Sequence, residues 1–242
     1  SCRIQRMLTS IWDGFLSFLH FTGEITLAAF EIVRGSNVCR RCDVALMVQQ
    51  AGVQALPIVA LISFLVGLIM AFVGAVQLSL FGADIYVANL VGIAMVREMG
   101  AMMTAMVMAG RTGAAYAAQI GSMRVNEEID ALQVLGVSPI SFLVLPRMVA
   151  LFLMMPLLAS FSNLIGILGG LVVAVFMLDV GPAQYFNQMQ AAIFPNSVCI
   201  GLIKASVFGI IIGMVGCLRG MQCGGSSSAV GEASTSAVVT SI

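Results

Sequence analysis

Charged side chains are scarce in this sequence, and their scarcity excludes a soluble globular domain. Asp, Glu, Lys and Arg make up 9% of the 242 residues, whereas they approach a quarter of an ordinary soluble domain. The formal net charge is zero, so the chain has no basic excess of the kind that binds nucleic acid, and no nucleic-acid partner is expected. Hydrophobic residues make up 60%, which predicts an all-α integral membrane protein.

The sequence also has few of the residues that build catalytic or metal sites. It contains one histidine, His20, and no GxxxxGK[ST] loop, so any ATP hydrolysis must belong to another chain. Of its six cysteines only Cys39 and Cys42 have CxxC spacing, and a lone pair without a nearby histidine is weak evidence for zinc or redox chemistry. The sequence therefore predicts a protein that is not an enzyme and binds no metal or cofactor directly.

Long apolar runs take the place of the missing charge. Residues 44–83 and 148–178 contain no charged side chain, and each run exceeds the roughly 20 residues that cross a bilayer. Spans are predicted at about residues 48–80, 87–117, 140–178, 195–218 and 232–242, the last cut off by the end of the sequence. The expected fold is thus about five transmembrane helices, with residues 35–242 forming a single transmembrane domain.

Residues 1–34 have a different pattern. Apolar and polar residues alternate there at helical spacing, so that they gather on opposite halves of a helical wheel. A helix of this kind lies in the membrane interface, and Trp12 would sit at the depth of the headgroups. The segment is therefore predicted to be an interfacial amphipathic helix.

A short charged helix is predicted between the second and third spans, at about residues 127–135. Asn126 is a suitable N-cap, acidic residues follow in the first turn, Gly136 can take the left-handed position that ends a helix, and Pro139 prevents continuation. Its apolar side is formed by Val125, Ile129, Leu132 and Leu135. Such a helix either lies on the lipid or docks on a partner protein.

The distribution of arginine sets the orientation. Eight arginines fall on one side of the membrane, and the opposite loops carry only Asp84 and Asp179. Because positive loops stay in the cytoplasm, the amino terminus and the charged helix are predicted to be cytoplasmic. The arginines on that side are Arg3, Arg6, Arg34, Arg40, Arg41, Arg124, Arg147 and Arg219.

Arg97, Glu98 and Lys204 are the candidate functional residues within the spans. Ionisable groups at membrane depth are costly, so they usually face a cavity, a partner or a transport pathway. The alternative is that Glu98 pairs with Arg97 or with Lys204 and only fastens helices together. Adjacent helical residues point about 100° apart, so Arg97 and Glu98 are not expected to serve one narrow contact.

Several motifs resemble the central region of the MlaE permease family, the membrane subunit of MCE-associated ABC transporters. They lie in the chain from about residue 50 onward. These motifs are Arg97-Glu98-Met99-Gly100, Ala109-Gly110-Arg111, Gly121-Ser122-Met123-Arg124-Val125, Glu128-Ile129-Asp130-Ala131-Leu132, Val134-Leu135-Gly136-Val137, Pro146-Arg147, Gly201-Leu202-Ile203-Lys204-Ala205-Ser206-Val207-Phe208-Gly209 and Gly231-Glu232-Ala233-Ser234-Thr235.

The resemblance implies a permease of the bacterial inner membrane that moves phospholipid between that membrane and a periplasmic MCE protein, helping to maintain outer-membrane lipid asymmetry. It implies a permease homodimer, a cytoplasmic ABC ATPase that binds ATP and magnesium, a periplasmic MCE-domain protein and a small cytoplasmic STAS-type regulator. Because they are ionisable at membrane depth, Arg97, Glu98 and Lys204 are predicted to line the substrate cavity of such a permease. Residues 121–135 would be the coupling helix that meets the ATPase, through Gly121, Met123, Arg124, Glu127, Glu128, Ile129, Asp130 and Leu132.

Three positions depart from the family pattern. Gln119 stands where an acidic residue is common, Ala101 where proline is common, and Ser138 where aspartate often precedes the proline. Because Gln119 is not acidic, docking of the ATPase is expected to depend more on the acidic residues of the predicted coupling helix.

A second class of function stays open from the residues alone. Glu98 and Lys204 could form the proton or ion relay of a secondary transporter. Such transporters favour inverted repeats with broken helices in matching halves, and no internal symmetry of this kind is visible in the sequence.

Overall fold

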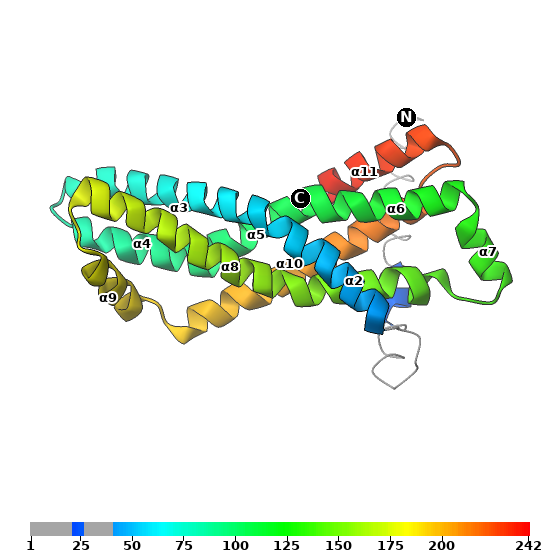
Figure 1. The fold of residues 1–242 in the computed structure, drawn as a ribbon, viewed down its shortest axis with the longest axis horizontal. Coiled ribbons are helices and arrows are strands. Elements are labelled where there is room, and N and C mark those ends of the chain that lie inside the picture. Colours follow the sequence, from blue (N-terminus) through cyan, green and yellow to red (C-terminus); the bar gives the residue numbers. More distant parts are fainter. Residues whose placement is uncertain (1–20, 27–40) are drawn as a thin grey trace, which may run out of the picture. The chain divides into compact units, whose positions relative to one another are not determined.

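The computed structural model describes residues 21–26 and 41–242, and these residues are helical apart from short connections (Figure 1). The described part of the chain contains no β-strand, which confirms the all-α fold class. The prediction of an interfacial helix over residues 1–34 falls mostly outside the described residues. Within it, residues 21–26 are helical, and Phe21 and Ile25 are buried, each 6% exposed.

Four helical segments of the described chain are long and apolar enough to cross a membrane. They extend over Leu46–Ser79, Asp84–Val125, Ile140–Leu178 and Pro195–Met221, within a few residues of four predicted spans except at the end of the second. That segment has 42 residues, about 63 Å of helix, which is roughly twice the thickness of a hydrocarbon core. It must therefore extend beyond the apolar layer.

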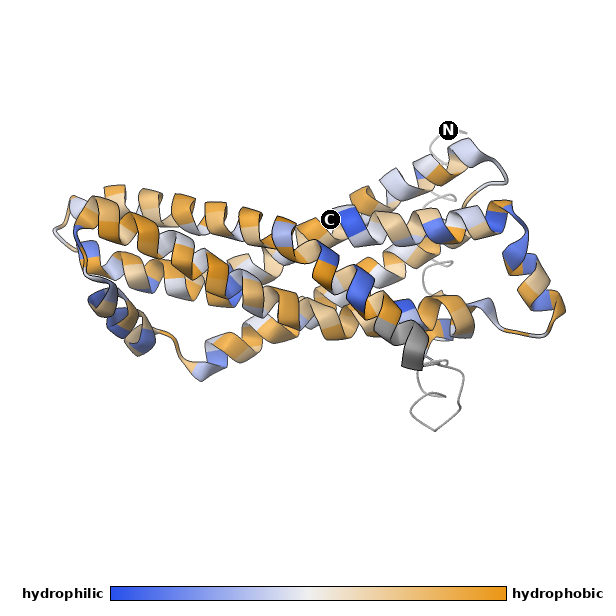
Figure 2. Cartoon of the chain, in the orientation of Figure 1, coloured by the Kyte–Doolittle hydropathy of each residue, from blue (hydrophilic) through white to orange (hydrophobic). Residues whose placement is uncertain are grey.

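The first span shows how the local sequence sets the ends of a helix. It consists of α2 (Arg41–Gly52), the 3₁₀ turn η1 (Val53–Ala55) and α3 (Leu56–Ser79). Pro57 lies in the first turn of α3, where its missing N–H costs nothing. Beyond Ser79 the chain reverses at Gly82, whose φ of +66° is a conformation that glycine adopts without strain. Figure 2 shows α3 apolar along nearly its whole length.

The second span is interrupted by two π-helical segments that the sequence did not predict. After the 3₁₀ turn η2 (Asp84–Tyr86) come α4 (Val87–Ala94), η3 (Met95–Met99), α5 (Gly100–Met108), η4 (Ala109–Gly113) and α6 (Ala114–Val125). A third π segment, η5 (Ile140–Val144), precedes α8 (Leu145–Leu178). Each π turn holds one more residue than an α turn, and such turns are frequent at functional sites.

The described helices divide between two compact units, and the boundary passes through α8 and α10 (Pro195–Met221). One unit contains residues 48–111 and 150–212. In it α3 and α8 approach so closely that a Cβ on Gly67 would overlap the backbone of Gly166, and one on Gly169 would overlap the carbonyl of Phe64. Small residues thus permit backbone contact, as is usual between membrane helices.

A buried polar contact joins the same two helices. The hydroxyls of Ser63 and Ser162 lie 2.6 Å apart, and both residues are 0% exposed. An unpaired hydroxyl in an apolar interior is costly, so the two groups satisfy one another. The contact fixes the register between α3 and α8.

Helix α9 (Pro182–Ala192) lies between the third and fourth spans, where no helix is predicted from the sequence. It starts with proline in its first turn, a signal that would have allowed it to be predicted. Tyr185 is fully buried against its own unit and donates to the carbonyl of Ile167 at 3.4 Å. Burial raises the pKa of Tyr185 to about 12, so the phenol stays protonated and remains a donor at neutral pH.

The other unit contains residues 1–47, 112–149 and 213–242, of which 21–26 and 41 onward are described. Helix α11 (Ser227–Ser241) packs along α6 through Ala233 and Ala237. It begins five residues before the fifth span predicted from residue 232, and its 15 residues, about 22 Å, are shorter than a bilayer core. The described chain thus has four helices of spanning length, and the fifth, truncated span stays a prediction.

Candidate functional site

The π turn η3 carries two of the three candidate charges. Arg97 and Glu98 lie in it about 20 Å along the helix from Asp84, well inside the apolar part of the second span. The extra residue of a π turn widens the helix locally and alters the directions of neighbouring side chains. Only Glu98 reaches Lys204 on α10, while Arg97 contacts Glu98 itself, so the two adjacent residues do not share one partner, as the α-helical spacing predicted.

The three charged side chains form one cluster. The carboxylate oxygen Oε1 of Glu98 lies 2.5 Å from Lys204 Nζ and 3.7 Å from Arg97 Nε. Two cations therefore share one carboxylate, and the longer contact leaves the guanidinium of Arg97 less compensated than the ammonium of Lys204. The exposed fraction of the side chain is 52% for Arg97, 46% for Glu98 and 37% for Lys204. The cluster is therefore accessible from outside the unit that contains it.

Gly201 allows α10 to bring Lys204 to this cluster. A Cβ on Gly201 would overlap the carbonyl oxygen of Val96 and would lie 3.8 Å from the Cα of Arg97. Only glycine permits so close an approach to the π turn. Lys204 follows one helical turn later, on the same side of α10.

Asn163 supports the other end of the π turn. Its Oδ1 lies against the Cα of Gly100, where a Cβ would overlap it, and it is buried without a hydrogen-bond partner in the described structure. The Thr104 hydroxyl donates to the Gly100 carbonyl at 2.7 Å. The residues around η3 are thus fixed by close contacts, while Arg97 remains accessible.

We expect Gly201→Ala to separate α10 from η3. An added methyl in a fully packed contact costs about 1–3 kcal/mol, because backbone must move to accept it. The thermal unfolding temperature in detergent should fall, as measured by loss of the monodisperse peak in size-exclusion chromatography. Gly231→Ala is the matched control, since a Cβ there meets nothing within 4 Å. Equal unfolding temperatures for the two variants would contradict the proposed packing role of Gly201.

The predicted coupling helix over residues 121–135 is divided in two. Helix α6 ends at Val125, and α7 extends over Glu128–Val134. Asn126 is not the N-cap: Glu127 takes that position in a left-handed conformation, φ +59°, without a side-chain cap. The amide of Asn126 instead donates to Glu128 Oε1 at 3.3 Å. The predicted end of the helix is confirmed, because Gly136 has a φ of +75°.

The residues of this segment differ in solvent exposure. Gly121 is buried against Cys223 and Val230, and Arg124 donates a hydrogen bond to the Met221 carbonyl. Ile129 is only 3% exposed, so it packs inside the chain instead of forming a free apolar face. Met123 and Leu132 are half-buried, and the exposed members are Arg124, Glu127, Glu128 and Asp130.

Two apolar side chains at the end of α7 extend this exposed surface. Val134 is 89% exposed and Leu135 76%, at the carboxyl-terminal end of α7. Together with the acidic residues they form a small surface of mixed character. Helical periodicity placed Leu135 beside Ile129 but gave no means of telling which one the fold covers.

Arg147, near the start of α8, is hydrogen-bonded to Gln119, one of the three positions that depart from the family pattern. The Arg147 guanidinium donates to Gln119 Oε1 at 3.4 Å and lies over the Tyr116 ring, 5.6 Å from its centre. Arg147 is 6% exposed, and two of its nitrogens have no acceptor in the described structure. Gln119 is therefore used within the chain as a neutral acceptor for Arg147.

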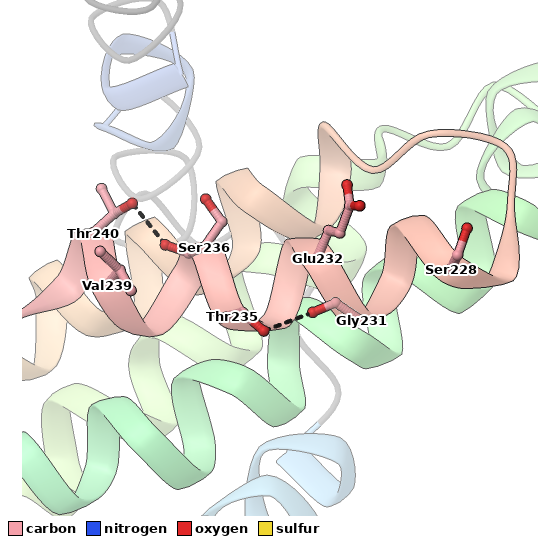
Figure 3. Close-up of a pocket in the computed structure, with 7 residues that line it drawn as sticks. All are labelled: Ser228, Gly231, Glu232, Thr235, Ser236, Val239 and Thr240. Carbon is pink, nitrogen blue, oxygen red and sulfur yellow. Dashed lines mark hydrogen bonds between the residues drawn. The ribbon is translucent and has the colours of Figure 1, made fainter.

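The outer side of α11 lines a shallow hollow that gathers none of the predicted site residues (Figure 3). Two of its hydroxyls donate within the helix, Thr235 to the Gly231 carbonyl at 3.0 Å and Thr240 to the Ser236 carbonyl at 2.7 Å. Glu232 is its one charged lining residue. Local acceptors of this kind let the Thr235 and Thr240 hydroxyls be satisfied without a partner outside the helix.

No group of three metal-ligating side chains occurs among the described residues. Cys199, Cys217 and Cys223 are free thiols. The CxxC pair stays untested, because Cys39 lies outside the described residues and the side chain of Cys42 is not described.

Comparison with known proteins gives a consistent result over nearly the whole chain. The family model described as Permease MlaE matches residues 45–242. A protein of Rickettsia felis named "Probable ABC transporter permease protein" is 36% identical, covering 98% of this chain and 93% of its own. The "Intermembrane phospholipid transport system permease protein MlaE" of Haemophilus influenzae is 29% identical, covering 98% and 92% respectively. A Synechocystis "Probable ABC transporter permease protein" is 34% identical, covering 100% and 90%.

Proposed function

The chain belongs to the MlaE permease family, and on that premise we propose that it is the membrane subunit of an ABC transporter for phospholipids. It passes phospholipid between the inner membrane and a periplasmic MCE-domain protein, which helps to maintain outer-membrane lipid asymmetry. The name of the Haemophilus relative, an intermembrane phospholipid transport system permease, supports phospholipid as the substrate class. ATP and magnesium bind to a separate ATPase subunit.

The observation that carries this proposal is the excess cation of the membrane cluster. Arg97 and Lys204 share the single carboxylate of Glu98, so one positive charge remains at membrane depth. Such a charge costs at least a few kcal/mol unless water or an anion compensates it. A phospholipid phosphate is an anion that a guanidinium binds with two parallel hydrogen bonds. Arg97 is therefore the proposed contact to the lipid headgroup, and Glu98 and Lys204 hold it in place.

The exposure of the cluster supports a homodimer. An open charged cluster in hydrocarbon is unfavourable, and a second permease copy can cover it and enclose a cavity. The charged segment around α7 is the proposed contact to a cytoplasmic ABC ATPase. A small cytoplasmic STAS-type regulator completes the proposed set of partners.

The proposed location is the bacterial inner membrane, with the amino terminus in the cytoplasm. The sequence predicts that eight arginines fall on one side of the spans, and the positive-inside rule assigns that side to the cytoplasm. Family membership favours an ATP-driven permease over a secondary transporter with a proton or ion relay through Glu98 and Lys204.

Affinity purification of the full-length protein in mild detergent tests the proposed function. We expect a nucleotide-binding subunit and an MCE-domain protein to co-purify, with ATPase activity in the eluate. Purification of the permease alone from cells that express its neighbours, with phospholipid movement unaffected by ATP depletion, would contradict an ABC mechanism.

A further inference from the structure

A second arginine lies within the apolar part of the chain, at Arg111 in the π segment η4. Its Nη2 donates to Gln54 Oε1 at 2.7 Å, and Gln54 belongs to η1 at the start of α3. The acceptor is a neutral amide, and no carboxylate pairs with Arg111 in the described part of the chain. Its charge is therefore held in a fixed direction but is not neutralised, and the remaining guanidinium donors are available to an anion.

The depth of this pair in the membrane follows from α3. This helix has 24 residues, about 36 Å, which is slightly more than the thickness of a hydrocarbon core. Gln54 lies just before its first turn, so the guanidinium that it binds is at the level where the apolar core meets the headgroups. The predicted orientation places this level on the cytoplasmic side.

An exposed apolar stripe leads away from Gln54 along α3. Its members recur at helical spacing and are 44–64% exposed: Ile58, Leu61, Leu65, Ile69 and Phe72. From Ile58 to Phe72 the stripe is about 21 Å long, close to the length of an extended phospholipid acyl chain. Helix α5, which packs beside α3, exposes Met102 and Met106 on its own outer side.

We propose that Arg111, oriented by Gln54, binds the phosphate of a phospholipid whose acyl chains lie along this stripe. A guanidinium at the headgroup level meets phosphate in a bidentate geometry, and Gln54 reduces the freedom lost on binding. This site depends on the proposed function only in that the chain lies in a phospholipid bilayer. It is separate from Arg97, which lies about 21 Å along the same helix.

Photo-crosslinking in nanodiscs tests the site. The full-length protein carries p-benzoylphenylalanine in place of Ile58, one turn from Gln54, in discs that contain phosphatidylglycerol and a phosphate-free glycosyl diacylglycerol. We expect phosphatidylglycerol to be crosslinked about ten times more than the glycosyl diacylglycerol, because only the phospholipid can accept a charge-assisted hydrogen bond from Arg111. Arg111→Gln should abolish the preference. Gln54→Glu should also abolish it, because the new carboxylate neutralises Arg111 and repels phosphate.

The matched control is Gln77→Glu, which adds the same charge to an exposed position at the other end of α3 and should keep the preference. An unchanged preference in both Arg111→Gln and Gln54→Glu would overturn the proposal. Complete loss of crosslinked lipid on adding inorganic phosphate would reassign the site to free phosphate and overturn the lipid assignment. Arg97→Ala should leave this preference intact, which separates this site from the proposed transport role of Arg97.

Discussion

Arg97→Ala is expected to reduce phospholipid transport about tenfold to a hundredfold. The variant removes the less compensated cation of the cluster and leaves Glu98 paired with Lys204 at 2.5 Å, so the helices stay fastened while phosphate loses its donor. Hydrogen bonds to charged groups contribute about 1.5–3 kcal/mol, which sets that range. The measurement is transfer of fluorescent phospholipid in proteoliposomes that contain the purified transporter.

Two further substitutions at the same position separate charge from geometry. Arg97→Lys keeps the charge but loses the bidentate fork, so it should retain part of the activity, whereas Arg97→Glu should be inactive. Co-purification of the ATPase subunit must be normal in each variant, because position 97 is on an exposed side of the π turn. Normal transport by Arg97→Ala, together with no lipid adduct from a photo-crosslinker at position 97, would contradict this role. The cluster would then serve only to hold the helices together.

Replacing Glu128 and Asp130 together by lysine is expected to release the ATPase subunit or to uncouple hydrolysis from transport. Both side chains are exposed at the start of α7, and the double change reverses the charge of the surface proposed to meet the partner. Placing like charges together across an interface costs several kcal/mol. The amount of co-purified ATPase and the ATP consumed per lipid transferred are the quantities to measure.

Glu232→Lys is the control for this experiment, because Glu232 is also an exposed acid but lies on α11, away from the segment proposed to dock. It should leave ATPase association unchanged. If the Glu128 and Asp130 double variant retains both its ATPase and its lipid transfer, the coupling role of α7 is wrong. Loss of the transporter peak in size-exclusion chromatography would instead show that the double variant affects folding.

The position of Ile129 changes how docking on α7 is understood. The sequence predicted one apolar face of Ile129, Leu132 and Leu135 for the partner groove. Because Ile129 is buried in its own chain, an ATPase can meet only the acidic side chains and the exposed pair Val134 and Leu135. The contact that we propose is therefore more electrostatic, and it should weaken as ionic strength rises.

The sequence by itself determined the membrane class, the positions of four spans and the left-handed end of the charged helix at Gly136. These features depend on local properties: the length of an apolar run sets a span, and glycine alone accepts φ of +75° without strain. It also identified Glu98 and Lys204 as a possible pair, since few ionisable residues occur in the spans. It did not reveal the start of α9, although the proline in its first turn was a usable signal.

Only the tertiary structure decided which neighbour each polar group has. The π turn at Arg97 and Glu98 depends on contacts with Gly201 and Asn163, which lie more than 60 residues away in the sequence. The partners of Arg111 and Arg147 are likewise set by helix packing, and so is the burial of Ile129. Periodicity gives the direction of a side chain from its own helix axis, but it contains no information on which other helix lies there.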